Sequence, residues 1–248
     1  MICLIRGKRE KKRRKEIKFE RKFNPAQVLA ISFIGAIITG TVLLLLPFST
    51  KTGQISFFDA LFTATSAICV TGLIVQDTAT YFTPFGHVVI LTLIQLGGLG
   101  VMTFSTLILL VAGKRISIRE RIIFQEAYHH RGAKDVAYLI RNIFLYAFVI
   151  EAAGILSLFL RWQKDFPWLK ALALSVFHSI SAFCNAGLSL FSENLLHYRD
   201  DVQVNITIVL LIIFGGLGFL VLQEMSGYFY GAIRKKRLKI SLHAKLVL

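Results

Sequence analysis

Two short segments share a pattern of small residues that ends in glycine, and each follows an apolar stretch. They consist of Cys69, Val70, Thr71 and Gly72 and of Cys184, Asn185, Ala186 and Gly187. Glycine adopts positive φ and leaves room for close approach, so a loop that ends in glycine can turn successive backbone carbonyls toward a common axis. Carbonyls arranged in this way can replace the hydration shell of an alkali cation. These residues therefore suit backbone coordination of a cation.

A glycine after a helix also has a simpler interpretation. Gly72 and Gly187 could each be the C-cap of a buried helical hairpin, because glycine is common where helices end. However, two copies stand at matching places in an apolar chain, and irregular backbone at membrane depth is tolerated only against protein or a water-filled cavity. The repetition favours cation coordination over simple capping.

The elements expected to position these segments are short apolar stretches, residues 57–67 and 169–182. Each has about the length of a re-entrant helix and is too short to cross a bilayer. Ser56 followed by Asp59 is typical of a capping box, so the first helix should begin at Phe57 on the outer side of the membrane. Its C-terminal end, which carries partial negative charge, then points at the bilayer middle and favours a cation.

Four longer apolar segments surround these stretches, residues 26–48, 85–112, 136–160 and 202–230. Hydrophobic residues make up 55% of the 248 and charged residues 17%, whereas soluble domains carry about 45–50% and about 25%. A helix over residues 26–48 would be about 34 Å long, which is enough to span a bilayer and too long for the core of a cleaved signal peptide. We expect an all-α polytopic membrane protein with four crossings.

The charges are clustered and one-sided. The formal net charge is +15, and most basic residues lie in residues 1–22, 112–135 and 231–248. The positive-inside rule places these clusters and both termini in the cytoplasm, where they can also attract anionic lipid headgroups. A nucleic-acid binder would carry its Lys and Arg on the surface of a folded soluble domain. The sequence indicates no soluble core, so nucleic-acid binding is not expected. Three cysteines are also too few for a disulfide framework.

The chain contains an internal repeat in parallel orientation. LFTATSAICVTGL from Leu61 aligns without gaps on VFHSISAFCNAGL from Val176, with six of thirteen residues identical, and LIQLGGLG from Leu93 matches LIIFGGLG from Leu211. Ordered repeats of this kind are common in transport proteins. The expected organisation is a basic segment (1–24), a first span, pore-loop and span unit (25–113), a linker (114–135), a second such unit (136–230) and a basic end (231–248).

Few other residues suggest chemistry. Glu151 is an ionisable residue within a span, which by default indicates a function, and its expected role is in cation passage. Gly97, Gly98 and Gly100 follow no strand, so close helix packing is expected there instead of dinucleotide binding. The spans carry no paired aspartates, His-x-x-x-His pair or Ser/His arrangement, so we do not expect an enzyme.

Three stretches resemble the Trk/Ktr/HKT superfamily of potassium transporters, and within it the bacterial KtrB-type membrane subunits. They are NPAQVLAISFIGAIITGTVLLLLPFSTKTGQISFFDALFTATSAICVTGL, FGHVVILTLIQLGGLGVMTFSTLILL and FHSISAFCNAGLSLF. The resemblance covers nearly all of the chain from Asn24 onward. It implies four span, loop and span units around a pseudo-fourfold axis, each loop ending in a filter glycine, here Gly72 and Gly187. Glycine at the first filter position goes with potassium selectivity and serine with sodium transport, so Gly72 favours potassium.

The resemblance also implies a passive potassium uptake subunit in the cell membrane, a homodimer on a cytoplasmic nucleotide-binding KtrA-type ring, with sodium stimulation in several members. Cys184 stands where the second filter usually carries asparagine. Two units alone would leave loop carbonyls against lipid, at several kcal/mol per group. We therefore expect this chain to be the N-terminal half of such a subunit, truncated or split. The alternatives are two copies that pair to complete a fourfold pore, and a sodium-selective transporter of the same superfamily.

Overall fold

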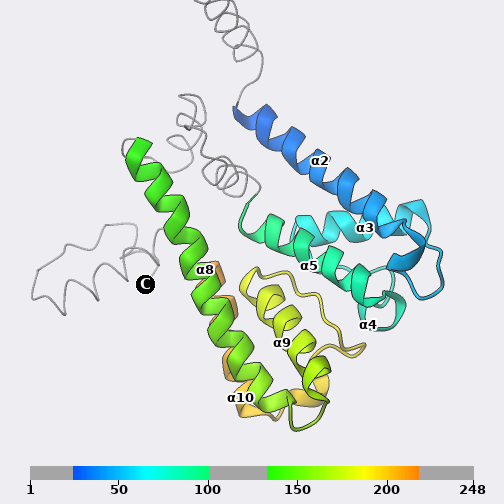
Figure 1. Cartoon of the computed structure of the whole chain (residues 1–248), viewed down its shortest axis with the longest axis vertical. Coiled ribbons are helices and arrows are strands. Elements are labelled where there is room, and N and C mark those ends of the chain that lie inside the picture. The colour runs from blue at the N-terminus through cyan, green and yellow to red at the C-terminus, as the bar shows by residue number, and fades with distance from the viewer. Residues whose placement is uncertain (1–24, 101–132, 218–248) are drawn as a thin grey trace, which may run out of the picture.

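The computed structural model describes residues 25–100 and 133–217, and this part of the chain is helical (Figure 1). The elements are α2 (Pro25–Leu44), η1 (Pro47–Ser49), α3 (Phe57–Ile68), α4 (Thr78–Tyr81), α5 (Pro84–Gly98), α8 (Ala133–Trp162), α9 (Trp168–Phe183), η2 (Leu196–Tyr198) and α10 (Val202–Gly216). Within these ranges the β pairing amounts to one isolated bridge between Thr50 and Phe82. The expected all-α class agrees with what is described.

The longer helices form two groups of three. Helices α2, α3 and α5 pack against one another, as do α8, α9 and α10, and the groups meet where α5 contacts α9. In Figure 1, α3 lies beside α2 and α5, and α9 lies beside α8. Helix α3 begins at Phe57, where the sequence predicts it, and α9 extends the predicted stretch by one residue at each end.

Of the four expected crossings, one is long and apolar enough within the described residues, Arg141–Trp162 in α8. The described parts of α2, α5 and α10 count as shorter apolar helices. The predicted segments 85–112 and 202–230 begin within the described residues and end outside them. The basic segments 1–24 and 231–248 and most of the linker lie wholly outside. The four crossings and the cytoplasmic termini therefore stay predictions.

Glycines permit the same close helix contact in both groups. A Cβ atom at Gly40 in α2 would lie 2.7 Å from Leu93 in α5, and one at Gly154 in α8 would lie 2.8 Å from Leu211 in α10. Because Leu93 and Leu211 are equivalent in the internal repeat, Gly40 and Gly154 are equivalent as well. Small residues at these points let the helix backbones approach one another.

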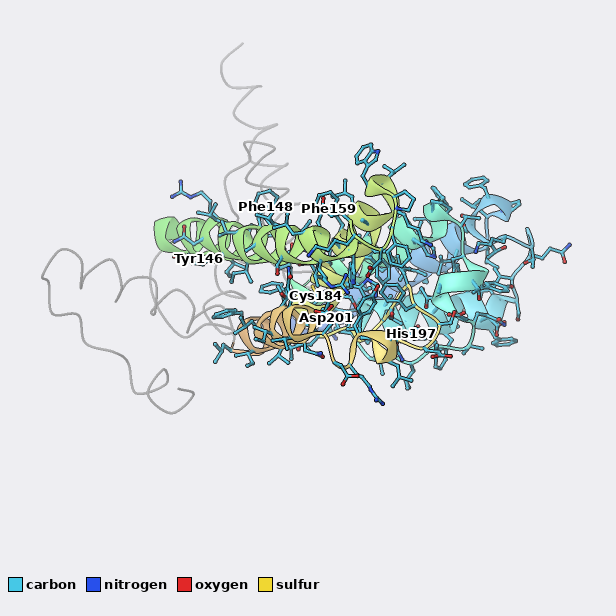
Figure 2. All side chains as sticks on the ribbon, turned by 90° about the horizontal axis from the view of Figure 1, so that it is seen from below. Tyr146, Phe148, Phe159, Cys184, His197 and Asp201 are labelled. Carbon is cyan, nitrogen blue, oxygen red and sulfur yellow. The ribbon has the colours of Figure 1, made fainter. Side chains whose placement is uncertain are left out.

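The long helices present large apolar side chains outward. Ile34 and Ile38 of α2 are 55% and 56% exposed, and Phe148 of α8 is 70% exposed. Figure 2 shows Phe148 on the outer side of α8, with Tyr146 on the same helix. A helix that is apolar on its outer face as well as its inner one is expected inside a membrane.

Candidate functional site

The first loop (residues 69–72) leaves α3 through a Schellman motif. The Val70 N–H donates to the Ala67 carbonyl at 3.3 Å, and the Thr71 N–H donates to the Ser66 carbonyl at 2.9 Å. Val70 has φ 56° and Gly72 has φ 78°. Positive φ is uncommon for a β-branched residue, so the two hydrogen bonds hold Val70 in a conformation that it disfavours.

The second loop (residues 184–187) leaves α9 in the same way. The Asn185 N–H donates to the Ala182 carbonyl at 3.0 Å, and the Ala186 N–H donates to the Ser181 carbonyl at 2.8 Å. Asn185 has φ 59° and Gly187 has φ 68°. Both loops thus follow one backbone pathway, with positive φ at their second and fourth residues.

This geometry overturns the interpretation of Gly72 and Gly187 as helix caps. In a Schellman motif the capping residue with positive φ is the one whose N–H bonds the second carbonyl from the helix end. Val70 and Asn185 occupy that position. The glycines come two residues later, so their positive φ reorients the chain beyond the cap.

A serine in each short helix holds the exit of the loop that follows. The Ser66 hydroxyl donates to the Leu73 carbonyl at 2.7 Å, and the Ser181 hydroxyl donates to the Leu188 carbonyl at 2.7 Å. Sequence reasoning did not single out these serines. The same serine stands at this position in both aligned stretches. That identity could have predicted a shared hydrogen bond, because a buried hydroxyl needs a partner.

The two loops lie next to each other. A Cβ atom at Gly72 would lie 2.7 Å from the Ala186 carbonyl oxygen and 3.5 Å from the Gly187 Cα, and one at Gly187 would lie 3.7 Å from the Gly72 Cα. The structure therefore brings both predicted glycines together. Within residues 25–100 and 133–217, no three His, Cys, Asp or Glu side chains are grouped to hold a metal ion.

The two loop cysteines have different surroundings despite their equivalent positions. Cys69 is exposed and Cys184 is buried, and Figure 2 places Cys184 in the interior between helices. The Cys184 thiol donates to Gln95 Oε1 at 3.9 Å, and a Cβ atom at Gly98 would lie 2.5 Å from the Cys184 Sγ. Helix α5 of the first group therefore covers the second loop, and Gly98 has the close-packing role expected of it.

Glu151 lies behind the second loop. It is 6% exposed, and its Oε1 accepts a hydrogen bond of 2.9 Å from Gln95 Nε2. The Ser179 hydroxyl of α9 donates to the Glu151 main-chain carbonyl at 2.8 Å. The described hydrogen bonds of Glu151 thus join α8 to α5 and α9. Gln95 was missed from the sequence, although it is the one polar residue in LIQLGGLG.

The predicted capping box at α3 is wrong in its hydrogen bonds. Ser56 is the N-cap residue, but its side chain makes no capping hydrogen bond. Asp59 Oδ2 instead accepts a hydrogen bond of 3.0 Å from Gln76 Nε2. Gln76, in the segment after the first loop, competes for the carboxylate, and Asp is shorter than the Glu of a typical capping box. Asp59 still lies in the first turn, where the helix dipole favours negative charge.

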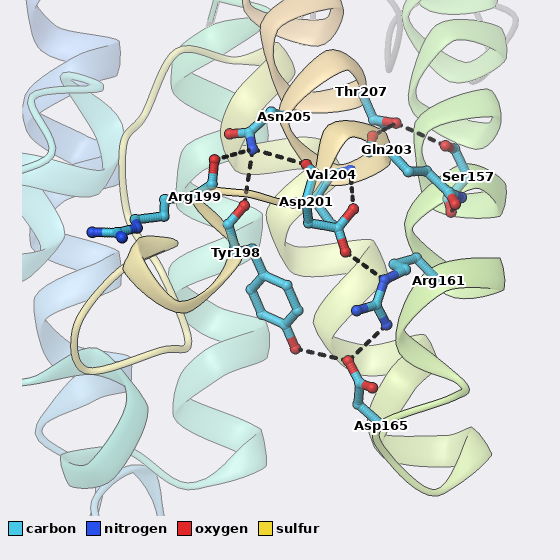
Figure 3. A network of polar contacts seen from close by, with 10 residues as sticks. All are labelled: Ser157, Arg161, Asp165, Tyr198, Arg199, Asp201, Gln203, Val204, Asn205 and Thr207. Carbon is cyan, nitrogen blue, oxygen red and sulfur yellow. Dashed lines mark hydrogen bonds and ion pairs between the residues drawn. The ribbon is translucent and has the colours of Figure 1, made fainter.

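The segment after the second loop is tied down by polar contacts at the start of α10 (Figure 3). Asp201 caps α10 by accepting a hydrogen bond of 3.1 Å from the Val204 N–H, and the Arg161 guanidinium donates to the same carboxylate. Arg161 also donates to Asp165 at 2.8 Å. Burial raises the pKa of Asp201. The hydrogen bond from Val204, together with the hydrogen bond and positive charge of Arg161, outweighs burial and leaves the pKa below its ordinary value.

A buried histidine in α9 holds the start of the same segment. His178 is 3% exposed, and its Nδ1 lies 2.8 Å from the Leu174 carbonyl while its Nε2 lies 3.0 Å from the Ser189 hydroxyl. Its ring packs edge-on against Trp162 with centroids 5.1 Å apart. His178 was also missed from the sequence, where Thr63 is its counterpart.

The helical architecture of the described residues, with one helix in α8 long and apolar enough to cross a membrane, is consistent with a membrane transporter. The profile of the TrkH family, described as a cation transport protein, matches residues 1–246. The chain therefore belongs to the TrkH family, which is a family of cation transporters and not of enzymes.

Curated relatives narrow the similarity. The chain is 47% identical over 228 residues to Ktr system potassium uptake protein B of Bacillus subtilis (strain 168), covering 92% of this chain and 49% of that protein. It is 39% identical over 222 residues to the protein of the same name from Vibrio alginolyticus, covering 90% and 48%. It is 39% identical over 229 residues to the potassium/sodium uptake protein NtpJ of Enterococcus hirae, covering 92% and 49%. The chain spans about half the length of these relatives.

Proposed function

We propose that this chain supplies half of the pore of a potassium uptake system, with residues 69–72 and 184–187 as two parts of its selectivity filter. The juxtaposition of Gly72 with Ala186 and Gly187 carries the proposal. Both loops have positive φ at the same two positions, which suits backbone carbonyls turned toward one axis.

In this mechanism the chain does no covalent chemistry. A potassium ion would exchange its water for loop carbonyls and move down its electrochemical gradient. Helices α3 and α9 end at the loops, so their partially negative C-terminal ends face the ion. Ser66 and Ser181 hold the loop exits through the Leu73 and Leu188 carbonyls.

The test joins the chain to the remaining half of a relative. The chain, joined to the C-terminal half of the Bacillus subtilis relative, is expected to rescue growth of potassium-uptake-deficient cells at low potassium. Empty vector is the control, and protein in the membrane is verified by immunoblot. Membrane-inserted chimera that gives no rescue would refute the proposal.

Ion choice and partners are part of the same proposal. Gly72 favours potassium, whereas the name of the Enterococcus relative includes sodium, so sodium transport or sodium stimulation is the second candidate. Uptake of potassium with and without sodium, by the rescued chimera, separates them. The Ktr system names imply further subunits. The proposal extends to a homodimer on a KtrA-like nucleotide-binding ring, which co-purification with the Bacillus ring subunit would test.

A self-paired pore is favoured by one specific observation. Helix α5 covers one side of the second loop, whereas the equivalent side of the first loop is open and its Cys69 is exposed. By repeat equivalence, Ile213 and Gly216 of a second copy would take the places of Gln95 and Gly98. A Gly216→Cys variant should then form a disulfide with Cys69 of another copy in membranes. Monomers alone after oxidation would refute self-pairing.

A further inference from the structure

A polar chain behind the second loop is not needed for cation coordination itself. The Cys184 thiol donates to Gln95 Oε1 at 3.9 Å, and Gln95 Nε2 donates to Glu151 Oε1 at 2.9 Å. Both hydrogen bonds run in the same direction, toward the carboxyl group. Such chains polarise their members and hold them in one arrangement.

Both ends of this polar chain are firmly seated. Ser179 of α9, which is 0% exposed, donates to the Glu151 carbonyl at 2.8 Å. A Cβ atom at Gly154 would lie 2.5 Å from the same Ser179 hydroxyl. At the other end, the Cys184 side chain fills the space that Gly98 leaves open. A shift of Gln95 would therefore be transmitted to Cys184, the first residue of the loop.

The internal repeat supplies a built-in comparison. The counterparts of Glu151, Gln95 and Ser179 in the other unit are Ile37, Ile213 and Ala64. Apolar residues therefore suffice at these positions for the helices to pack. A buried carboxyl group is costly unless it is hydrogen-bonded, so its presence beside only one of the two loops requires another reason.

We propose that Glu151 is a positioning residue for the second loop, which acts through Gln95 on Cys184 and thereby sets the affinity of the loop for its cation. This inference rests on the proposed function of residues 184–187 as part of the filter. Glu151 need not touch the ion. Its carboxyl oxygen orients the Gln95 amide, whose oxygen then retains the Cys184 side chain against α5.

The first experiment uses this chain alone in membranes, so it does not depend on transport. In a Cys3→Ser and Cys69→Ser background, a small maleimide reports the accessibility of Cys184. Glu151→Ile removes the acceptor and introduces the residue tolerated at the equivalent position. It should raise the labelling rate about threefold or more, as loss of one hydrogen bond predicts. Glu151→Gln keeps an acceptor oxygen and should stay near the parent rate.

Two further variants keep this experiment decisive. Gln95→Ile breaks the same series of hydrogen bonds and should raise the labelling rate of Cys184 at least as much as Glu151→Ile does. Cys184 in the double variant should be no more reactive than in Gln95→Ile alone. Ser157→Ala is the matched control, because it removes a 2.7 Å contact between α8 and Thr207 of α10 away from the loop. Labelling that is unchanged by Glu151→Ile, or by Gln95→Ile if the first variant does not insert, would overturn the proposal.

The second experiment measures uptake by the restored chimera. At equal membrane protein, Glu151→Ile should raise the KM for potassium about threefold or more and leave the maximal rate within about twofold, whereas Glu151→Gln should restore the parent KM. A lower maximal rate with unchanged KM would indicate a merely structural role and overturn the proposal. A parent chimera that does not transport would instead refute the proposed function, while the labelling result still decides the role of Glu151.

Discussion

The two capping residues share a backbone conformation that only one of their side chains tolerates well. Val70 and Asn185 both have positive φ, although only asparagine is enriched there. Hydrogen bonds from each helix end hold these conformations. Local strain of this kind persists where the surrounding structure over-determines it, and it clusters at functional sites.

Replacement of Gly72 by serine is expected to damage the loops in two ways. A side chain at φ 78° is strained, and its Cβ would lie 2.7 Å from the Ala186 carbonyl oxygen. We expect a loss of about 1–3 kcal/mol in the stability of this loop arrangement and a lower ratio of potassium to sodium uptake by the restored chimera. Gly35→Ala is the control, because a Cβ at Gly35 meets nothing within 4 Å. An unchanged ratio for Gly72→Ser would contradict the assignment.

Exchange of the two capping residues should have opposite effects. Val70→Asn places a residue that tolerates positive φ at a strained position and should raise the free energy of unfolding by about 1 kcal/mol, whereas Asn185→Val should lower it by a similar amount. Thermal unfolding in detergent, followed by intrinsic fluorescence, measures both. Equal shifts in the same direction would show that backbone strain is not the cause.

At the scale of elements, a glycine in α5 and one in α10 let each of these helices pack closely against the end of the short helix that precedes it. A Cβ at Gly97 in α5 would collide with the Ile68 carbonyl at the end of α3, and one at Gly215 in α10 would collide with the Phe183 carbonyl at the end of α9. The close packing expected of Gly97 is therefore confirmed. Each loop leaves its helix at a point that a neighbouring helix backbone holds in place.

The start of α10 should respond to acid. The pKa of Asp201 is lowered in the folded protein, so its stabilising contribution is present above the ordinary carboxyl pKa and is lost as the pH falls through the folded pKa. Asp201→Ala should reduce stability by about 1 kcal/mol at neutral pH through loss of the cap. Its difference from the parent should stay constant above about pH 5 and shrink as the pH falls below the ordinary carboxyl pKa. Unfolding curves in detergent across this range provide the measurement, and a difference that grows toward low pH would contradict the prediction.

At the scale of the whole molecule, the two loops are unequally covered. In the second loop, Cys184 and the following Leu188 are buried, at 8% and 4% exposed. Their counterparts at the first loop are exposed: Leu73 is 59% exposed, and Cys69 is also exposed. The difference follows from the chain order, because α5 of the first group reaches the second loop and no described helix reaches the first loop in the same way. The first loop therefore presents an open side.

Fusion of the chain to the C-terminal half of the Bacillus subtilis relative should close that side. In the chimera, maleimide labelling of Cys69 should fall about tenfold relative to the chain alone, as the thiol becomes buried between helices. A Cys3→Ser and Cys184→Ser background isolates the signal. In a separate variant that also lacks Cys69, Phe148→Cys at an exposed position serves as a control whose labelling should not change. Equal labelling of Cys69 in both proteins would count against a pore that the two halves of the chimera form together.

Much of the fold followed from apolar length. The predicted stretches 57–67 and 169–182 became α3 and α9, since a helix of that length needs only local hydrogen bonds and an apolar surface to pack against. The capping box did not form, because Gln76 reaches Asp59 from outside the helix. Gln95 and His178 were missed because a polar residue in an apolar run reveals its role only when its partner is known.

By itself, the sequence determined the helical class, the internal repeat, the two glycine-ended loops and the resemblance that agrees with the TrkH family, because these depend on composition, spacing and residue identity. Only the tertiary structure decided that Val70 and Asn185 form the caps and that Gly72 lies against Ala186. It also decided that Glu151 reaches Cys184 through Gln95. The physical reason is that such contacts join residues far apart in the sequence, 89 positions for Cys184 and Gln95, and the packing of helices, not local preference, brings them together.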